Sequence, residues 1–85
     1  MLEIHYFAAA RAAAGTAQES AEPAASLGEL LDALAAAHTG TTEAGMTLAQ
    51  VLERCTFLID GKNAERDAVL DGAARVDILP PFAGG

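Results

Sequence analysis

The sequence has little positive charge. Its 85 residues include five Lys or Arg against twelve Asp or Glu, which gives a formal net charge of −7 at pH 7. Nucleic-acid-binding proteins need clustered basic side chains to neutralise phosphates, so this composition argues against a nucleic-acid partner. Two interpretations of the acidic surface stay open. It can dock on a partner with a basic surface, or it can be a solvated surface that only maintains solubility.

Cysteine is almost absent, because Cys55 is the single one in the chain. One cysteine cannot form an internal disulfide, and no Cys/His cluster has the spacing of metal ligands, so we expect no metal site. This usage fits a reducing compartment and predicts a cytoplasmic protein. Cys55 falls between a predicted helix and a predicted strand, where a buried structural thiol is favoured over a reactive one.

Long hydrophobic runs are missing as well. No apolar run reaches transmembrane length, so we expect no membrane partner. The segment Ala8–Ala14 resembles the apolar core of a signal peptide. Arg11 interrupts it, however, and Glu3 stands where such peptides carry basic residues, so we expect no signal peptide.

Large apolar side chains are few. The hydrophobic fraction is 52%, but alanine supplies much of it and aromatic residues make up only 5%. A chain of this length forms one core, so we expect a single domain over residues 1–85 with a flexible tail at 80–85. The predicted core consists of Leu2, Ile4, Tyr6, Leu30, Leu34, Phe57, Ile59, Val76 and Ile78.

Short patterned segments open the chain. Leu2–Phe7 alternates apolar and more polar residues, which predicts a half-buried strand. Ala8–Ala14 consists of strong helix formers, and Gly15 is a natural C-terminal stop. The polar segment 17–22 predicts an edge strand that ends at Pro23.

Two further helices are predicted from their caps and apolar faces. The longer covers Leu27–His38, with Ser26 as its N-cap and Glu29 as the partner in a capping box. The shorter covers Leu48–Arg54, with Thr47 as its N-cap.

The last third of the chain is strand-rich. Thr56–Asp60 predicts a strand that enters a hairpin turn at Asp60-Gly61. A short returning strand is expected at Asn63–Arg66. The final strand covers Arg75–Leu79 and must end there, because Pro80 has no backbone N–H for the sheet.

The C-terminus is the most informative segment, and it reads Pro80-Pro81-Phe82-Ala83-Gly84-Gly85. A terminal Gly-Gly carries a carboxylate that no side chain shields, so it can be threaded into a narrow active site of another protein. The prolines favour an extended path, and six residues reach about 20 Å. A frayed terminus is the simpler alternative, but it does not explain a di-proline directly after a strand.

The segment from Arg75 to Gly85 resembles the C-terminus of the MoaD family, the small sulfur-carrier subunit of molybdopterin synthase. The opening strand, the alanine-rich segment to Gly15 and the turns at Asp60-Gly61 and 70–72 fall where that family has corresponding features. The resemblance covers nearly the whole chain. It implies an α+β fold of the β-grasp (ubiquitin-like) type, a mixed sheet with one long helix packed across one face and the first and last strands side by side.

The resemblance also implies a chemistry for Gly85. Its carboxylate would be adenylated by a partner resembling the ubiquitin-activating enzymes, which uses ATP and Mg, and a sulfurtransferase would then convert it to a thiocarboxylate. The large subunit of molybdopterin synthase, expected in a heterotetramer, would transfer that sulfur to the pyranopterin precursor. Pro80, Pro81, Phe82, Ala83 and Gly84 would thread through the partner. The chain itself would bind no cofactor and supply no acid, base or metal.

Two alternatives stay open. The first is a sulfur carrier for thiazole, cysteine or tRNA thiolation, which shares the fold and the Gly-Gly end. The di-proline and the segment 48–54 favour the molybdopterin branch. The second is a ubiquitin-like modifier that forms isopeptide bonds, in which case chains grow only at Lys62, the single lysine, or at the N-terminus.

A docking surface is predicted from strand parity. If Phe57 and Ile78 face the helix, then Phe7, Leu58 and Leu79 face away and form an apolar patch near the tail. A register error of one residue would exchange the two faces.

The remaining polar residues that could act as acids or bases are interpreted as structural or solvent-exposed rather than catalytic. His5 is expected to face outward, His38 to close a helix, and Glu65 and Asp67 to lie in a solvated turn.

Overall fold

The computed structural model describes residues 1–81, so the predictions for Phe82, Ala83, Gly84 and Gly85 lie outside the described residues. Strands and helices alternate in the first part of the chain, and three consecutive strands end it. In chain order the elements are β1 (Leu2–Tyr6), α1 (Ala8–Ala14), β2 (Gln18–Ala21), α2 (Leu27–Ala37), α3 (Leu48–Leu52), β3 (Thr56–Ile59), β4 (Lys62–Ala64) and β5 (Arg75–Leu79).

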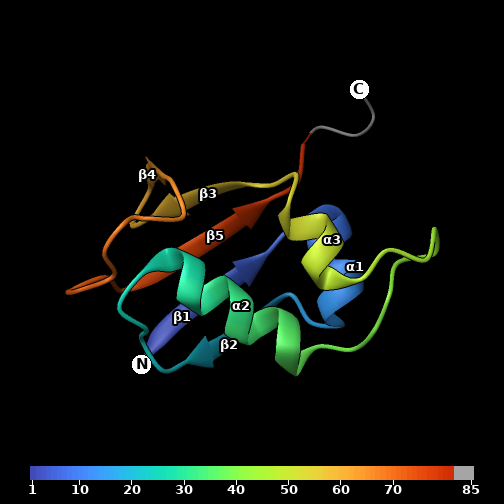
Figure 1. Ribbon diagram of the computed structural model, residues 1–85, viewed down its shortest axis with the longest axis horizontal. Helices are drawn as coiled ribbons and strands as arrows, with labels where there is room; N and C mark the ends of the chain where they lie inside the picture. Colours follow the sequence, from blue (N-terminus) through green and yellow to red (C-terminus); the bar gives the residue numbers. More distant parts are fainter. Residues whose placement is uncertain (82–85) are drawn as a thin grey trace.

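The strands form a five-stranded mixed sheet in the order β2-β1-β5-β3-β4. The first and last strands, β1 and β5, are parallel neighbours at its centre, and every other pairing is antiparallel. The long helix α2 lies across one face of this sheet (Figure 1). The expected β-grasp architecture is therefore confirmed, including the edge position of β2.

Local signals in the sequence explain where the helices begin and end. Gly15 ends α1 in a left-handed conformation with φ of 77°, and its N–H donates to the carbonyl of Arg11. The Ser26 hydroxyl accepts the backbone N–H of Glu29 at the start of α2. At α3 the capping box is complete, because Thr47 and Gln50 each accept the other's backbone N–H.

Two helix ends differ from the prediction. Helix α2 ends at Ala37, and His38 is its C-cap rather than its last residue. Helix α3 ends at Leu52 instead of Arg54, because the N–H groups of Arg54 and Cys55 bond to carbonyls three residues back. This tighter winding is typical of helix ends.

The β3–β4 hairpin turns at Asp60 and Gly61, both with positive φ, as a type I′ turn requires. This two-residue turn pairs Lys62 with Ile59, so β4 begins one residue earlier than predicted. It also ends earlier, since the carbonyl of Arg66 accepts the N–H of Gly28 at 2.7 Å and directs the chain toward α2.

The core lies between the sheet and the helices. Eight of the nine predicted core residues are buried, and Ile59 is only partly buried because it adjoins the exposed hairpin turn. The turn expected at 70–72 is present, because the N–H of Ala73 donates to the carbonyl of Leu70, and the Leu70 side chain is 1% exposed. The Leu70 N–H bonds to the carbonyl of Ala25, which holds the loop before β5 over the core.

Candidate functional site: the exit of the C-terminal tail

The central strand β5 leads directly to the tail. It ends at Leu79, which pairs with Thr56, the first residue of β3. Pro80 follows half-buried and Pro81 is exposed, so the ladder stops at the predicted residue. The chain leaves the sheet at the end where α1 and α3 lie (Figure 1). The structure thus places the first two residues of the predicted tail, the half-buried Pro80 and the exposed Pro81, at this end of the sheet.

A small hollow lies beside this exit. We call it the tail-root hollow; it has a volume of about 110 Å³ and is lined by Ala9, Met46, Val51, Arg54, Pro80 and Pro81. These residues come from α1, the loop before α3, α3 and its C-terminal end, and the tail. Sequence reasoning missed the hollow, since no local pattern shows that three separate segments, around residues 9, 46–54 and 80–81, meet there.

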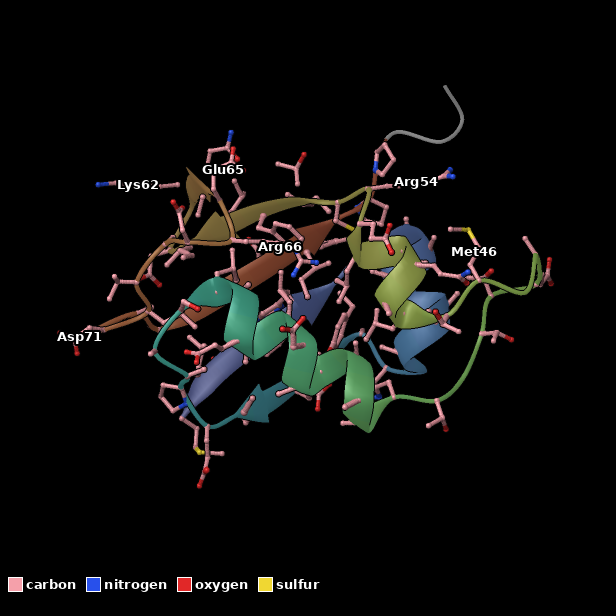
Figure 2. All side chains as sticks on the ribbon, viewed as in Figure 1. Met46, Arg54, Lys62, Glu65, Arg66 and Asp71 are labelled. Carbon is pink, nitrogen blue, oxygen red and sulfur yellow. The ribbon has the colours of Figure 1, made fainter. Side chains whose placement is uncertain are left out.

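Arg54 is the charged side chain of the tail-root hollow. Within residues 1–81, Arg66 pairs with Asp32 and Arg75 with Asp77, whereas no carboxylate lies within ion-pair distance of Arg54. Its side chain points outward next to the departing chain (Figure 2). A cation is therefore presented at the tail exit of an acidic protein.

The predicted docking residues share the sheet face opposite α2. Leu58 and Leu79 alternate with the buried Phe57 and Ile78, so the predicted register is correct. Leu58 pairs with Asp77, and Leu79 is its diagonal neighbour. Phe7, 39% exposed, lies beside them because its N–H donates to the carbonyl of Ile78. Their role in docking stays a prediction.

The same face becomes charged away from the tail. His5 Nε2 lies 3.1 Å from Glu3 Oε1, and Arg75 Nε donates to Asp77 Oδ1 at 2.7 Å. His5 faces away from the core, as predicted, and adjoins Asp77 across the ladder. Charged side chains therefore border the apolar patch directly, because Asp77 lies between Leu58 and His5 in the ladder.

The thiol of Cys55 has a structural environment. It is half-buried, and Sγ donates to the carbonyl of Val51 at 3.2 Å. Burial raises the pKa of this thiol to about 11, so it is protonated at neutral pH. The predicted structural role fits this environment better than a role in sulfur chemistry.

A hydrogen-bond network that the sequence did not reveal joins three elements. The Glu19 carboxylate on β2 accepts the hydroxyl proton of Tyr6 at 2.6 Å and also bonds Nε2 of His38 at the end of α2. Burial, and next the bond to Glu19, raise the pKa of Tyr6 above its usual range. The Tyr6 and His38 rings meet edge to face. We interpret the network as structural, because it ties the edge strand to the helix.

Other candidates show no catalytic arrangement. Glu65 and Asp67 are exposed, in a turn closed by the N–H of Ala68. No group of three His, Cys, Asp or Glu within residues 1–81 is placed to hold a metal ion. In the same part of the chain, no helix combines the length and the apolar character needed to cross a membrane.

Comparison with known families decides the classification. The ThiS family matches residues 4–85, a range that includes the terminal Gly-Gly. The chain belongs to the ThiS family. These are ubiquitin-like sulfur carriers, and the suspected relationship to carriers of the MoaD type is consistent with this membership. A comparison with curated protein sequences found no significant match.

Solved structures support the fold of this ThiS-family chain. A crystal structure of SAMP1 from Haloferax volcanii superposes with a TM-score of 0.68 at 24% identity, covering 99% of this chain and 98% of that one. A second crystal structure, of the H. volcanii small archaeal modifier protein 1, gives a TM-score of 0.64 at 24% identity over 95% and 97% of the two chains. At this identity the likeness shows the ubiquitin-like fold.

Proposed function

We propose that the chain is a sulfur carrier whose Gly85 carboxylate is converted to a thiocarboxylate. The observation that supports the proposal is that the central strand β5 ends at Leu79 and continues through Pro80 to the exposed Pro81, four residues before Gly85 in the sequence. Membership of the ThiS family over residues 4–85 supports it independently. The protonated state of Cys55 supports it as well, because that residue is a poor site for nucleophilic sulfur.

The chemistry begins with activation, because a carboxylate is a poor electrophile. A carboxylate oxygen of Gly85 attacks the α-phosphate of ATP, and pyrophosphate leaves to give an acyl adenylate. A persulfide sulfur from a sulfurtransferase then attacks the acyl carbon and AMP leaves. Reduction of the resulting acyl disulfide by a thiol yields the thiocarboxylate. An adenylating partner of the ubiquitin-activating type uses the ATP and Mg, while this chain positions its end.

We further propose that the acceptor is the pyranopterin precursor of molybdopterin, and that this chain is the small subunit of molybdopterin synthase. The di-proline and the helix α3 favour this branch, as the resemblance to the MoaD family implies. Each carrier delivers one sulfur, so two loaded carriers are consumed per dithiolene. The large synthase subunit is then the partner that receives the loaded tail.

A second candidate is a protein modifier, favoured by the likeness to a structure described as a small archaeal modifier protein. The same acyl adenylate would form an isopeptide bond with a lysine of a target protein. This reaction releases AMP and leaves no sulfur on the chain.

Reconstitution tests the proposed function. Loaded carrier is mixed with the large subunit and the pyranopterin precursor, and we expect dithiolene product with two carriers returned to the carboxylate form per product. A loaded carrier that leaves the precursor unchanged contradicts the molybdopterin assignment. Covalent conjugates that form in lysate with ATP, and that are lost on deletion of Gly85, would favour the modifier.

A further inference from the structure

The tail-root hollow gives the tail exit a second surface, distinct from the apolar patch on the sheet. Pro80 and Pro81 form one wall, and α1 with α3 form the others. Leu58 and Leu79 lie on the opposite face of the sheet. A partner that surrounds the tail therefore meets the sheet patch on one side and the hollow on the other.

The hollow combines an apolar floor with a free cation. Ala9, Met46 and Val51 supply the apolar part, and Arg54 stands at its edge with no carboxylate partner within residues 1–81. A guanidinium is well suited to bind a carboxylate through two parallel hydrogen bonds. In a chain of net charge −7, a cation at this position favours an acidic group on the partner rather than a basic one.

Met46 is held in place by its loop. Its N–H bonds the Thr42 hydroxyl at 3.2 Å, and its carbonyl accepts the N–H of Thr42 at 2.9 Å. A bridge between Thr41 and Thr47 closes the loop. Because the backbone is fixed before binding, little ordering is needed, while the flexible thioether can adapt to an incoming side chain.

We propose that the tail-root hollow and Arg54 form a docking site for the adenylating partner, which inserts an apolar side chain into the hollow and places a carboxylate against Arg54. This inference rests on the proposed function. The terminal Ala-Gly-Gly offers almost no side chains for recognition, so an enzyme that selects this chain must read the residues around the tail exit.

The test measures ATP–pyrophosphate exchange with an adenylating enzyme of the ubiquitin-activating type, purified from the same source, at varied carrier concentration. Arg54→Glu and Met46→Asp are compared with two controls. Lys62→Glu makes the same charge change on exposed β4, at the far end of β3 from the tail. Val69→Asp alters a side chain that is 70% exposed at a separate hollow lined by 23–25 and 69–73.

We expect Arg54→Glu and Met46→Asp to raise the KM for the carrier about tenfold or more, with a smaller effect on kcat, as a docking defect requires. The two controls should stay within about twofold of the wild type, because both side chains lie away from the tail exit and outside the proposed contact. Equal melting temperatures of Arg54→Glu and the two controls show that folding is unaffected. Because Met46 packs partly against the core, the KM of Met46→Asp is measured at a temperature where circular dichroism shows the variant folded.

The outcomes separate this inference from the proposed function. Absence of exchange with the wild-type chain contradicts adenylation itself. Normal exchange in which Arg54→Glu behaves like Lys62→Glu overturns the docking site alone. Variants with normal exchange that fail only in transfer to the large subunit also overturn it, since the hollow would then serve the later partner.

Discussion

At the scale of single residues, burial determines the protonation state of Cys55, the one thiol of the chain. The pKa of Cys55 is raised to about 11 because its thiolate would be poorly solvated. A thiol whose pKa is higher in the folded than in the unfolded state contributes to the stability of the fold at pH values below its ordinary pKa. That contribution is lost as the pH rises through about 11.

We therefore predict that Cys55 reacts slowly with iodoacetamide in the folded protein. At pH 8 the rate should be at least about tenfold below that of the urea-unfolded chain, and it should still be increasing at pH 10, because only the thiolate reacts. Mass spectrometry of quenched samples follows the reaction. A folded-state rate that levels off below pH 8 would show a low-pKa, reactive thiol and would contradict the structural role.

Asp60 illustrates what sequence analysis found and missed at one residue. The Asp-Gly dipeptide predicted the hairpin turn correctly, because turn chemistry is local. It did not indicate that the Asp60 carboxylate also accepts the N–H groups of Ala74 and of Arg75, the first residue of β5. That second role depends on a segment fourteen residues away and has no signature near Asp60.

At the scale of elements, periodicity and caps predicted every helix and strand, half of their ends to the residue and the other ends within one or two residues. The bounds of α1 and β5 were correct because their stop signals, Gly15 and Pro80, act within one residue. The ends of α3 and β4 were wrong because hydrogen bonds outside the regular pattern decide them. The tail-root hollow and the Glu19 network join distant segments, so neither could be predicted without the fold.

The Glu19 network should contribute to stability. We predict that Glu19→Ala lowers the free energy of unfolding by about 1–3 kcal/mol, because the hydroxyl of Tyr6 and Nε2 of His38 each lose a partner in a part-buried site. Urea denaturation measures the change. Glu22→Ala, at an exposed position beyond β2, is the matched control and should cost less than about 0.5 kcal/mol. Equal effects of the two substitutions would contradict the network.

At the scale of the whole molecule, stability and function occupy different parts of the fold. The core lies on the helix-covered face of the sheet, while the tail exit and the apolar patch lie outside it, with Phe7 exposed and Leu58 and Leu79 half-buried. Substitutions at the tail exit should therefore weaken the binding of partner proteins without unfolding the domain.

A substitution at Leu58 tests whether the apolar patch is a docking surface. We predict that Leu58→Asp weakens binding to the large synthase subunit by a few kcal/mol, as expected for a central apolar anchor. Isothermal titration calorimetry gives the affinity, and circular dichroism confirms the fold. Val69→Asp introduces the same charge at an exposed apolar site away from the patch and should bind normally. Unchanged affinity of Leu58→Asp would show that the patch is not the docking surface.

A substitution at Gly84 tests the prediction that the tail threads into a narrow active site of a partner. Since a β-branched side chain adds bulk and restricts the backbone, Gly84→Val should block adenylation or sulfur transfer. The melting temperature should change little, because every core residue described lies within residues 2–78. Normal turnover would contradict threading, and so would a loss of activity explained by a lower melting temperature.

The position of the sulfur is the central claim, and intact-mass spectrometry tests it most directly. After incubation with the adenylating enzyme, ATP and a sulfur donor, the account predicts a gain of about 16 Da, the exchange of one oxygen for sulfur at an activated carboxylate. The gain should be confined to the C-terminal peptide. It should persist in Cys55→Ala and disappear when Gly85 is deleted. A gain that survives deletion of Gly85, or one that Cys55→Ala abolishes, would contradict the account.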